Sequence, residues 1–309
     1  MRFEQCLRDS AVRFPDKTAL VASGKRLTFS QLDDLSDELA QGLLNRGIAR
    51  GDRVVLFLDN SVEAVVSIFA VLKAGAVFSP VNPTTKADKL AFILNNCRAR
   101  GIITQQKIAG VAADAVEAAP SIAVSVIADG EAAPNGFAHW NEVLSAPKFA
   151  LLNGASGIDI DLAMLIYTSG STGFPKGVMM THQNVAAAAT SITTYLENTA
   201  DDVILNVLPV AFDYGLYQVL MAVKVGATLI LEKSFAFPQV ILNRCAEEKV
   251  TGLPWCRPWR RSSLPNAIWC QARCRICATS RTRLRLCHLR TLSGCRRCFR
   301  TWRCIPCTA

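Results

Sequence analysis

The stretch LIYTSGSTGFPKGVMM, residues 165–180, has the form of an anion-binding loop between two β-strands. Apolar residues predict one strand at 162–167 and a second at 178–181. Between them comes a run of six small residues, four of them with hydroxyl groups: Thr168, Ser169, Gly170, Ser171, Thr172 and Gly173. Glycine lets the backbone approach a ligand closely, and N–H groups, hydroxyls and the ammonium group of Lys176 attract anions. We therefore expect this loop to bind phosphate groups.

The spacing of the loop separates it from two common phosphate-binding motifs. A Walker A loop needs Gly-Lys-Ser/Thr in series, but Lys176 lies between Pro175 and Gly177. The glycines do not follow the dinucleotide fingerprint either. The string instead resembles the phosphate-binding signature of the adenylate-forming superfamily, which includes acyl-CoA synthetases, luciferases and the adenylation domains of peptide synthetases. Every position of that signature is matched between Leu165 and Val178.

The chain up to Pro254 predicts an α/β fold in which parallel sheets are flanked by helices. Strands and helices alternate, as is typical of such folds. Before the loop we expect strands at 18–22, 52–58, 76–81 and from 102, helices at 62–73 and 86–96, and a leucine-rich helix that Ser30 caps and Gly47 ends. After it we expect a helix to about 196, a strand from 203, a helix at 218–224, a strand at 227–231 and a helix at 238–249. The Ala-rich residues 105–160 are expected to be peripheral.

Two further segments, residues 27–54 and 72–94, resemble early core segments of acyl-CoA synthetases. In that family an aromatic and glycine-containing segment lines the acyl and nucleotide pockets. The resemblance makes Phe212, Tyr214 and Gly215 the candidates for the acyl side, although Asp213 stands where many relatives carry His. His182 is expected to help fix the start of the helix after the loop, and His139 is assigned no role.

The composition changes near Pro254. The net charge is +9, yet residues 251–309 hold thirteen Arg and no Lys, Asp or Glu, which leaves 21 basic and 25 acidic residues before them. Nine of the twelve Cys and four of the five Trp also lie in this tail. We therefore expect two units: a partial AMP-binding domain at 1–254 and an Arg/Cys-rich tail at 255–309 without a stable core or bound metal.

Two interpretations of the tail compete. The pairs Cys274/Cys277 and Cys295/Cys298 are separated by seventeen residues, a spacing compatible with zinc, and the arginines could bind nucleic acid. The other interpretation is a shift of the reading frame near codon 255. Reverse translation of WCRPWRR, starting two nucleotides into the first codon, permits VPTMAA, a family-like continuation. The same offset in WRCIPCTA permits ALYSMYG, which would begin the family's Tyr-Gly-x-Thr-Glu motif, so the frame shift is favoured.

The resemblance implies that the parent enzyme joins a carboxylic acid to ATP, releases pyrophosphate and passes the acyl group to a thiol. Residues 168–173 would hold the β- and γ-phosphates, and Lys176 would add charge or clamp the loop. Thr168 and Lys176 are then the catalytic candidates. The implied substrates are a carboxylic acid, ATP and coenzyme A. Mg²⁺ accompanies the ATP, and no metal ligand is assigned in this chain. The catalytic step is the stabilisation of charge on the leaving pyrophosphate.

The resemblance covers residues 1–254, roughly the first half of a full synthetase. The Mg²⁺-binding Glu, the ribose-binding Asp and the lid Lys of the family would follow later, so we expect this chain to be inactive. Two alternatives are a nucleotide-binding remnant without catalysis and a protein whose tail binds zinc or nucleic acid. No apolar run reaches the ~18–20 residues of a membrane span, and no signal peptide is seen, so a cytoplasmic location is expected.

Overall fold

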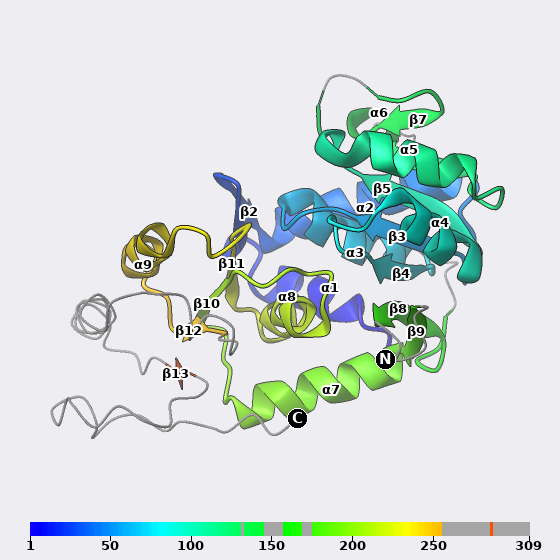
Figure 1. Cartoon of the computed structure of the whole chain (residues 1–309). Coiled ribbons are helices and arrows are strands. Elements are labelled where there is room, and N and C mark those ends of the chain that lie inside the picture. The colour runs from blue at the N-terminus through cyan, green and yellow to red at the C-terminus, as the bar shows by residue number, and fades with distance from the viewer. Residues whose placement is uncertain (131–132, 145–156, 169–174, 255–284, 287–309) are drawn as a thin grey trace, which may run out of the picture.

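Two β-sheets with helices between and around them form the structure, a computed structural model that describes residues 1–130, 133–144, 157–168, 175–254 and 285–286. Figure 1 shows the two sheets side by side, with α1 and α8 between them. The strands of the seven-stranded sheet, called sheet B, are ordered β7-β6-β5-β3-β4-β8-β9, and those of the six-stranded sheet A are ordered β13-β12-β10-β11-β1-β2. The predicted α/β class is confirmed.

Sheet B carries the phosphate-loop hairpin at one edge. Its strands are β3 (Arg53–Phe57), β4 (Val77–Pro80), β5 (Ala99–Thr104), β6 (Val124–Ile127), β7 (Phe137–His139), β8 (Leu162–Thr168) and β9 (Lys176–Thr181). All neighbours are parallel except β8 and β9, which are antiparallel. The exception follows from chain length, because a short loop joins two antiparallel strands, whereas parallel strands need a long crossover.

Sheet A combines the start of the chain with its later strands. Its members are β1 (Thr18–Ala22), β2 (Lys25–Thr28), β10 (Val203–Asn206), β11 (Thr228–Leu231), β12 (Gly252–Leu253) and β13 (Arg285–Leu286). The hairpin β1–β2 is antiparallel, and the other pairs are parallel. The central strands are apolar and almost wholly buried, as expected for strands covered on both faces.

Helices between and below the sheets contribute to one large apolar core. They are α1 (Gln5–Arg13), α2 (Phe29–Asn45), α3 (Val62–Lys73), α7 (His182–Tyr195) and α8 (Asp213–Val225). In α3 every residue except Glu63 is buried, which explains why the whole helix is apolar. Its final residue, Lys73, is buried too, and its ammonium group lies 2.6 Å from the carboxylate of Asp33 and 2.8 Å from that of Asp37. These contacts from α2 satisfy a charge that would otherwise be costly to bury.

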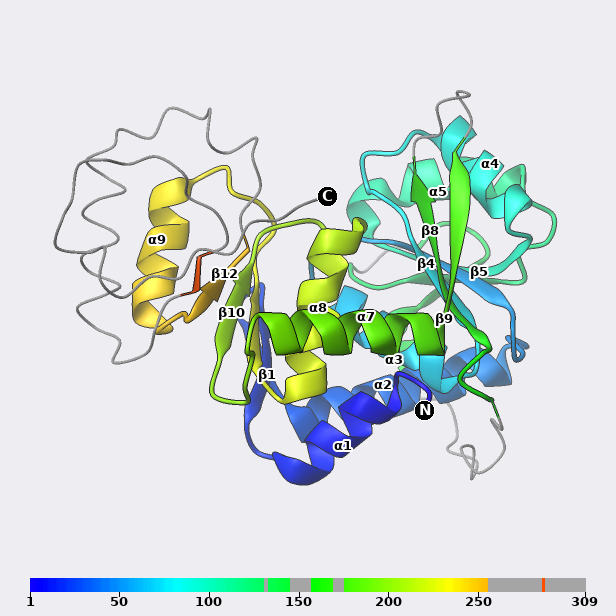
Figure 2. The same cartoon turned by 90° about the horizontal axis from the view of Figure 1, so that it is seen from below.

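The remaining helices cover the outer parts of the sheets. They are α4 (Ala87–Asn96), η1 (Gln106–Ile108), α5 (Ala109–Glu117), α6 (Trp140–Leu144) and α9 (Pro238–Glu247). Figure 2 shows α4 and α5 beside sheet B, α9 beside sheet A, and α7 crossing below the region between the sheets. Among the described residues, no helix is both long and apolar enough to cross a bilayer.

Three predictions about local structure are corrected. The cap of α2 is Thr28 instead of Ser30: its Oγ1 accepts the N–H of Gln31 at 3.2 Å, and the Gln31 side chain accepts the N–H of Thr28 at 2.9 Å. This reciprocal pair satisfies two N–H groups, which a cap at Ser30 would not do. Helix α8 begins at Asp213, five residues before its predicted start. Residues 105–160 are more than peripheral, because they supply β6 and β7 of sheet B.

Candidate functional site

A cavity of about 610 Å³ opens where β4 and β8 end, at the carboxyl edge of sheet B. Ligands of parallel α/β sheets commonly bind at this edge, because the loops that follow the strands meet there. The residues that line this cavity come from the loop after β4, from α4, from the end of β8 and from the segment before α8. They are Pro80, Val81, Asn82, Thr84, Thr85, Lys86, Asp88, Lys89, Ile93, Ile166, Tyr167, Thr168, Pro175, Ala211, Phe212 and Asp213.

The two ends of the predicted phosphate loop lie at the rim of this cavity. Thr168 is the last residue of β8, Lys176 is the first of β9, and the two pair across the hairpin. Thr168 and Pro175 line the cavity, while the side chain of Lys176 is exposed and has no ion-pair partner among the described residues. The other predicted phosphate ligands lie outside the described residues: Ser169, Gly170, Ser171, Thr172 and Gly173. The hairpin therefore holds the two ends of the loop against the cavity.

Neighbouring elements hold the strand that leads into the loop. The Tyr167 hydroxyl donates to Oδ1 of Asn96, at the end of α4, over 2.7 Å. The Ser79 hydroxyl of β4 donates to the carbonyl oxygen of Leu165 over 2.9 Å. Burial, together with the neighbouring Cys97 thiol, raises the pKa of Tyr167, so its hydroxyl keeps its proton at neutral pH. These bonds fix the end of β8 relative to β4 and α4.

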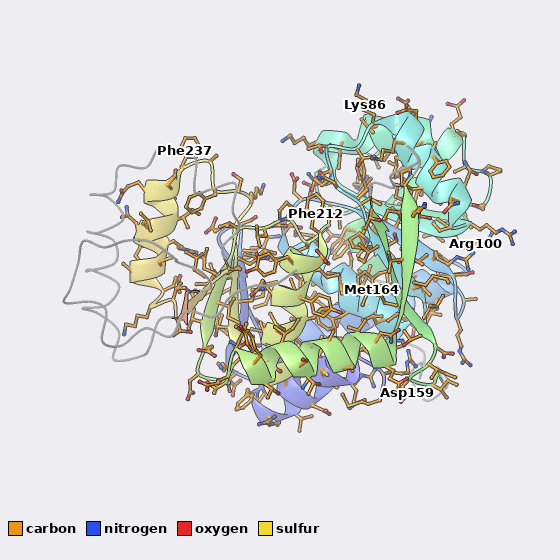
Figure 3. The ribbon with its side chains drawn as sticks, turned by 60° about the horizontal axis from the view of Figure 1, so that its bottom comes forward. Lys86, Arg100, Asp159, Met164, Phe212 and Phe237 are labelled. Carbon is orange, nitrogen blue, oxygen red and sulfur yellow. The ribbon has the colours of Figure 1, made fainter. Side chains whose placement is uncertain are left out.

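The facing wall comes from the segment before α8 and its first residue. Phe212, whose surface is 50% exposed, and Asp213 line the cavity, whereas Tyr214 and Gly215 do not lie on its wall. In Figure 3, Phe212 lies near the middle of the molecule, between Lys86 at the top and Asp159 at the bottom. A side chain at Gly215 would place its Cβ 2.3 Å from the carbonyl oxygen of Pro209. The glycine is thus required because the loop backbone crosses the first turn of α8.

One residue behind this wall escaped the sequence analysis. Tyr217 is 8% exposed, and its hydroxyl has no hydrogen-bond partner among the described residues. It lies one helical turn after Asp213, on the same face of α8. Burial and the Asp213 carboxylate raise the pKa of Tyr217 to about 12. The i, i+4 spacing from Asp213 was a signal available in the sequence, but only the fold shows that the hydroxyl is buried.

The cavity wall carries charges of both signs. Lys86 directly precedes α4, and Lys89 lies in that helix. Asp88 lies between them in the sequence, and Asp213 faces them from the start of α8. All four side chains are on exposed residues, so solvent screens their interactions. In the described part of the chain, no group of three His, Cys, Asp or Glu side chains could hold a metal ion. The described wall thus presents two ammonium groups and two carboxylates to the cavity.

His182 lies away from the cavity and has a structural environment. It is the first residue of α7, which Thr181 caps through a reciprocal pair of bonds with Asn184. The Nδ1 of His182 accepts the backbone N–H of Phe3 over 3.0 Å, and the side chain is buried. Burial, with a smaller contribution from the positive charge of Arg2, lowers the pKa of His182 to about 4. The neutral imidazole ties α7 to the first residues of the chain.

Comparison with known proteins identifies the family of this fold and site. The family model described as AMP-binding enzyme matches residues 7–256. The chain belongs to this family. The matched residues include both sheets except β13, the phosphate-loop hairpin and the segment before α8. Their limit at residue 256 lies close to the change in composition at Pro254.

The chain is similar to peptide synthetases and to a CoA synthetase. Bacitracin synthase 1 of Bacillus licheniformis is 34% identical over 251 residues, which are 80% of this chain and 4% of that protein. The phosphinothricin tripeptide synthetase PhsC of Streptomyces viridochromogenes is 35% identical over 250 residues, 79% of this chain and 21% of that protein. A fatty acyl CoA synthetase structure from Mycobacterium tuberculosis matches with a TM-score of 0.71 and 30% identity, over 82% of this chain and 49% of that one. The chain thus spans half or less of each relative.

Proposed function

We propose that this chain is part of an enzyme that activates a carboxylic acid with ATP and then transfers the acyl group to a thiol, that of coenzyme A. The observation that supports this most directly is the cavity of about 610 Å³ between the phosphate-loop hairpin and the segment before α8. Thr168 stands at one side and Phe212 with Asp213 at the other, so a nucleotide phosphate and a second substrate could meet between them. Family membership is consistent with this activity.

In the proposed reaction, a carboxylate oxygen of the acid attacks the α-phosphorus of ATP. The new bond is an acyl–phosphate anhydride, and the bond to the β-phosphate breaks to release pyrophosphate. Thr168 and Lys176, with Ser169 to Gly173, would hold the β- and γ-phosphates and stabilise the charge that develops on the leaving group. The thiol then attacks the acyl carbon and displaces AMP. No residue of this chain is assigned to Mg²⁺, which would accompany the phosphates of ATP.

The facing wall indicates which acids to test. Phe212 offers apolar contact, while Asp213 places a carboxylate at the cavity. The Tyr217 hydroxyl lies one turn behind it, with no hydrogen-bond partner in the part of the chain that the structure describes. A carboxylate beside a binding cavity favours a substrate that carries a cationic group. We therefore include amino acids with fatty and aromatic acids as candidate substrates, and a carrier-protein thiol with coenzyme A as a candidate acceptor.

We also propose that residues 255–309 are translated out of frame and that the chain as given is inactive. The change in composition and the codon offset described above support this proposal. Reading the nucleotide sequence around codon 255 in all three frames tests it. We expect one inserted or deleted base there, with VPTMAA following Pro254 in the restored frame. An uninterrupted frame with stoichiometric zinc in the purified protein would support the metal-binding interpretation instead.

The activity is tested by ATP–pyrophosphate exchange with a panel of fatty, aromatic and amino acids. The 309-residue chain is expected to show no acid-dependent exchange, because it lacks the family's Mg²⁺-binding Glu, ribose-binding Asp and lid Lys. Loss of a group of this kind commonly lowers the rate by ~10²–10³. The frame-restored protein is expected to show exchange and, with coenzyme A, to form AMP. A folded, frame-restored protein that never forms AMP or exchanges pyrophosphate would overturn the proposal. Nucleotide binding by the 309-residue chain without exchange would match a binding remnant.

A further inference from the structure

Asn60, between β3 and α3, joins the two sheets at the point where the cavity wall begins. It is 4% exposed, and all of its side-chain hydrogen-bonding groups face backbone groups of distant residues. Its amide nitrogen Nδ2 donates to the carbonyl oxygens of Leu208 and Glu232, each over 2.9 Å. Its Oδ1 accepts the backbone N–H of Val210, also over 2.9 Å. The side chain of Asn60, which follows β3 of sheet B, therefore bonds to three backbone groups in segments that follow strands of sheet A.

Those three groups belong to the connections that leave β10 and β11. Glu232 directly follows β11, and its N–H donates to the carbonyl oxygen of Asn206, the last residue of β10, over 2.9 Å. Leu208 and Val210 belong to the five-residue segment 207–211 that leads from β10 to Phe212 and Asp213. Asn60 thus holds both the end of sheet A and the segment that carries the cavity wall.

A second buried asparagine, Asn206, holds the same segment from the side of sheet A. It is fully buried; its Oδ1 accepts the N–H of Leu208 over 3.0 Å, and its Nδ2 donates to the carbonyl oxygens of Leu208 and Gly215, over 3.3 and 3.1 Å. The carbonyl oxygen of Leu208 consequently accepts from both asparagines. Buried amides that leave no donor or acceptor unpaired restrict a loop to one position, because any shift would leave a buried polar group without a partner.

Residues 207–211 contact α8, so the position of this loop determines the position of the cavity wall. The carbonyl oxygen of Pro209 accepts the N–H of Phe212 over 3.1 Å, and it lies too close to Gly215 for any side chain there. A movement of residues 208–210 would therefore displace Phe212 and the start of α8. Asn60 does not line the cavity, so its influence on a ligand is indirect.

We propose that Asn60 is a positioning residue of the acid-binding wall: it sets the place of Phe212 and Asp213 by holding residues 208–210 through both ends of its side-chain amide. The acid-binding role of this wall rests on the proposed function, whereas the clamp itself rests only on the contacts above. Because the bonds join sheet B to sheet A across 148 to 172 residues of sequence, they also fix the wall relative to the phosphate-loop hairpin on sheet B.

The sharpest variant is Asn60→Asp, which keeps size and shape but removes both N–H donors. It places a carboxylate against the carbonyl oxygens of Leu208 and Glu232. The matched control is Asn95→Asp on α4, since the Asn95 amide also donates to two carbonyl oxygens, those of Ala91 and Ala118, over 2.9 and 2.8 Å. Asn95 is exposed and does not line the cavity.

Amide hydrogen exchange of the 309-residue chain measures the clamp directly. In the unmodified chain, the Val210 amide should be as protected as the amides of β3. In Asn60→Asp, exchange at Val210 and Phe212 should accelerate by at least about tenfold, while β3 and β11 stay within about twofold and Asn95→Asp leaves residues 208–212 unchanged. An unprotected Val210 amide in the unmodified chain would overturn the proposal, and this result does not require the variant to fold. Exchange that accelerates equally in β3 and α3 of the variant would also overturn it.

Ligand binding separates this proposal from the proposed function. ATP, octanoate, benzoate and phenylalanine are titrated separately against the unmodified chain and both variants. For any acid that binds, Asn60→Asp should raise the Kd about tenfold and leave the Kd of ATP within about twofold. An equal loss of both affinities would make Asn60 a general structural residue and overturn the positioning role. If no acid and no ATP bind to the unmodified chain, the exchange result alone decides whether Asn60 positions this wall, and the proposed function is decided separately by the assays of the frame-restored protein.

Discussion

The hydroxyl of Tyr167 lies 2.7 Å from Oδ1 of Asn96 and ties the strand before the phosphate loop to the end of α4. Tyr167 also packs on the backbone of Gly177 in β9, where a Cβ would lie 3.2 Å from its ring. The same ring therefore contacts both strands of the hairpin. Its hydrogen bond restrains the hairpin from the side of the helix, and this restraint can be measured.

Removal of this bond should weaken the fold locally. Tyr167→Phe and Asn96→Ala should each lower the free energy of unfolding, and their coupling energy should be ~0.5–1.5 kcal/mol, the usual net contribution of one hydrogen bond. Urea unfolding of the two single variants and the double variant measures that coupling. Additive effects of the two substitutions would show that the bond contributes nothing to stability.

Lys176→Ala should weaken the binding of ATP. The ammonium group stands at the end of the loop with no ion-pair partner among the described residues, so it is available to a phosphate group. A charge-assisted contact of this kind contributes ~1.5–3 kcal/mol, which corresponds to a rise in Kd of about tenfold or more. Calorimetric titration with ATP provides the measurement.

The control for this variant is Lys107→Ala, which removes an equally exposed lysine from η1, away from the cavity. It should leave the Kd of ATP unchanged, because screening by salt suppresses its interaction with a distant phosphate. Equal affinities of the Lys176 variant and the unmodified chain would remove Lys176 from the phosphate site. The cavity and the rest of the loop would not be affected by that result.

Gly215→Ala should destabilise the protein. The added Cβ would lie 2.3 Å from the carbonyl oxygen of Pro209, so the loop before α8 would have to move. Overpacking of this kind costs ~1–3 kcal/mol. The control Gly110→Ala in α5 meets no atom within 4 Å and should be neutral or stabilising by ~0.5–1 kcal/mol, because alanine favours helices. Thermal or urea unfolding compares the two, and similar stabilities would contradict the packing argument.

Stability should fall as the pH is lowered from about 6.5 to about 4, partly through His182. The pKa of His182 is about 4 in the folded chain, below the ordinary histidine value of 6.5, so the unfolded chain binds more protons in this interval. The neutral imidazole therefore contributes stability that is complete above the unfolded pKa and is lost as the pH falls through the folded one. The expected loss is roughly 3 kcal/mol, from about 1.4 kcal/mol per pKa unit.

His182→Asn tests this pH dependence, since Asn can accept the Phe3 N–H without titrating in this range. The free energy of unfolding of the unmodified protein minus that of the variant should fall by roughly 3 kcal/mol as the pH is lowered from 6.5 to 4, because only the histidine gains a proton on unfolding. Glu4 lies 3.6 Å from His182 and has a raised pKa through burial, so it contributes the opposite slope. Because Glu4 is present in both proteins, the difference between them isolates the histidine. Parallel pH profiles would show that His182 is not buried as a neutral group.

Local patterns in the sequence predicted much of this fold. The apolar run with Glu63 near its start and Gly75 after its end predicted α3, and its bounds are those of the structure. The cap of α2 was misplaced by two residues, because Thr28 and Ser30 are both good capping residues and only the reciprocal bond with Gln31 distinguishes them. Of the predicted site, Thr168 and Phe212 line the cavity, while the roles of the candidate residues remain predictions.

The sequence alone determined the α/β class, the phosphate-loop motif and its resemblance to one superfamily, because these depend on residues that are neighbours in the chain. Only the tertiary structure decided that Asn60 meets Val210, that Tyr167 meets Asn96 and that the buried Tyr217 hydroxyl finds no partner among the residues described. Such contacts arise when two sheets and a helix pack against each other, and no periodicity within a single element encodes them. The wall of the cavity is therefore a property of the packed sheets, whereas the loop at its rim is already evident in sixteen consecutive residues.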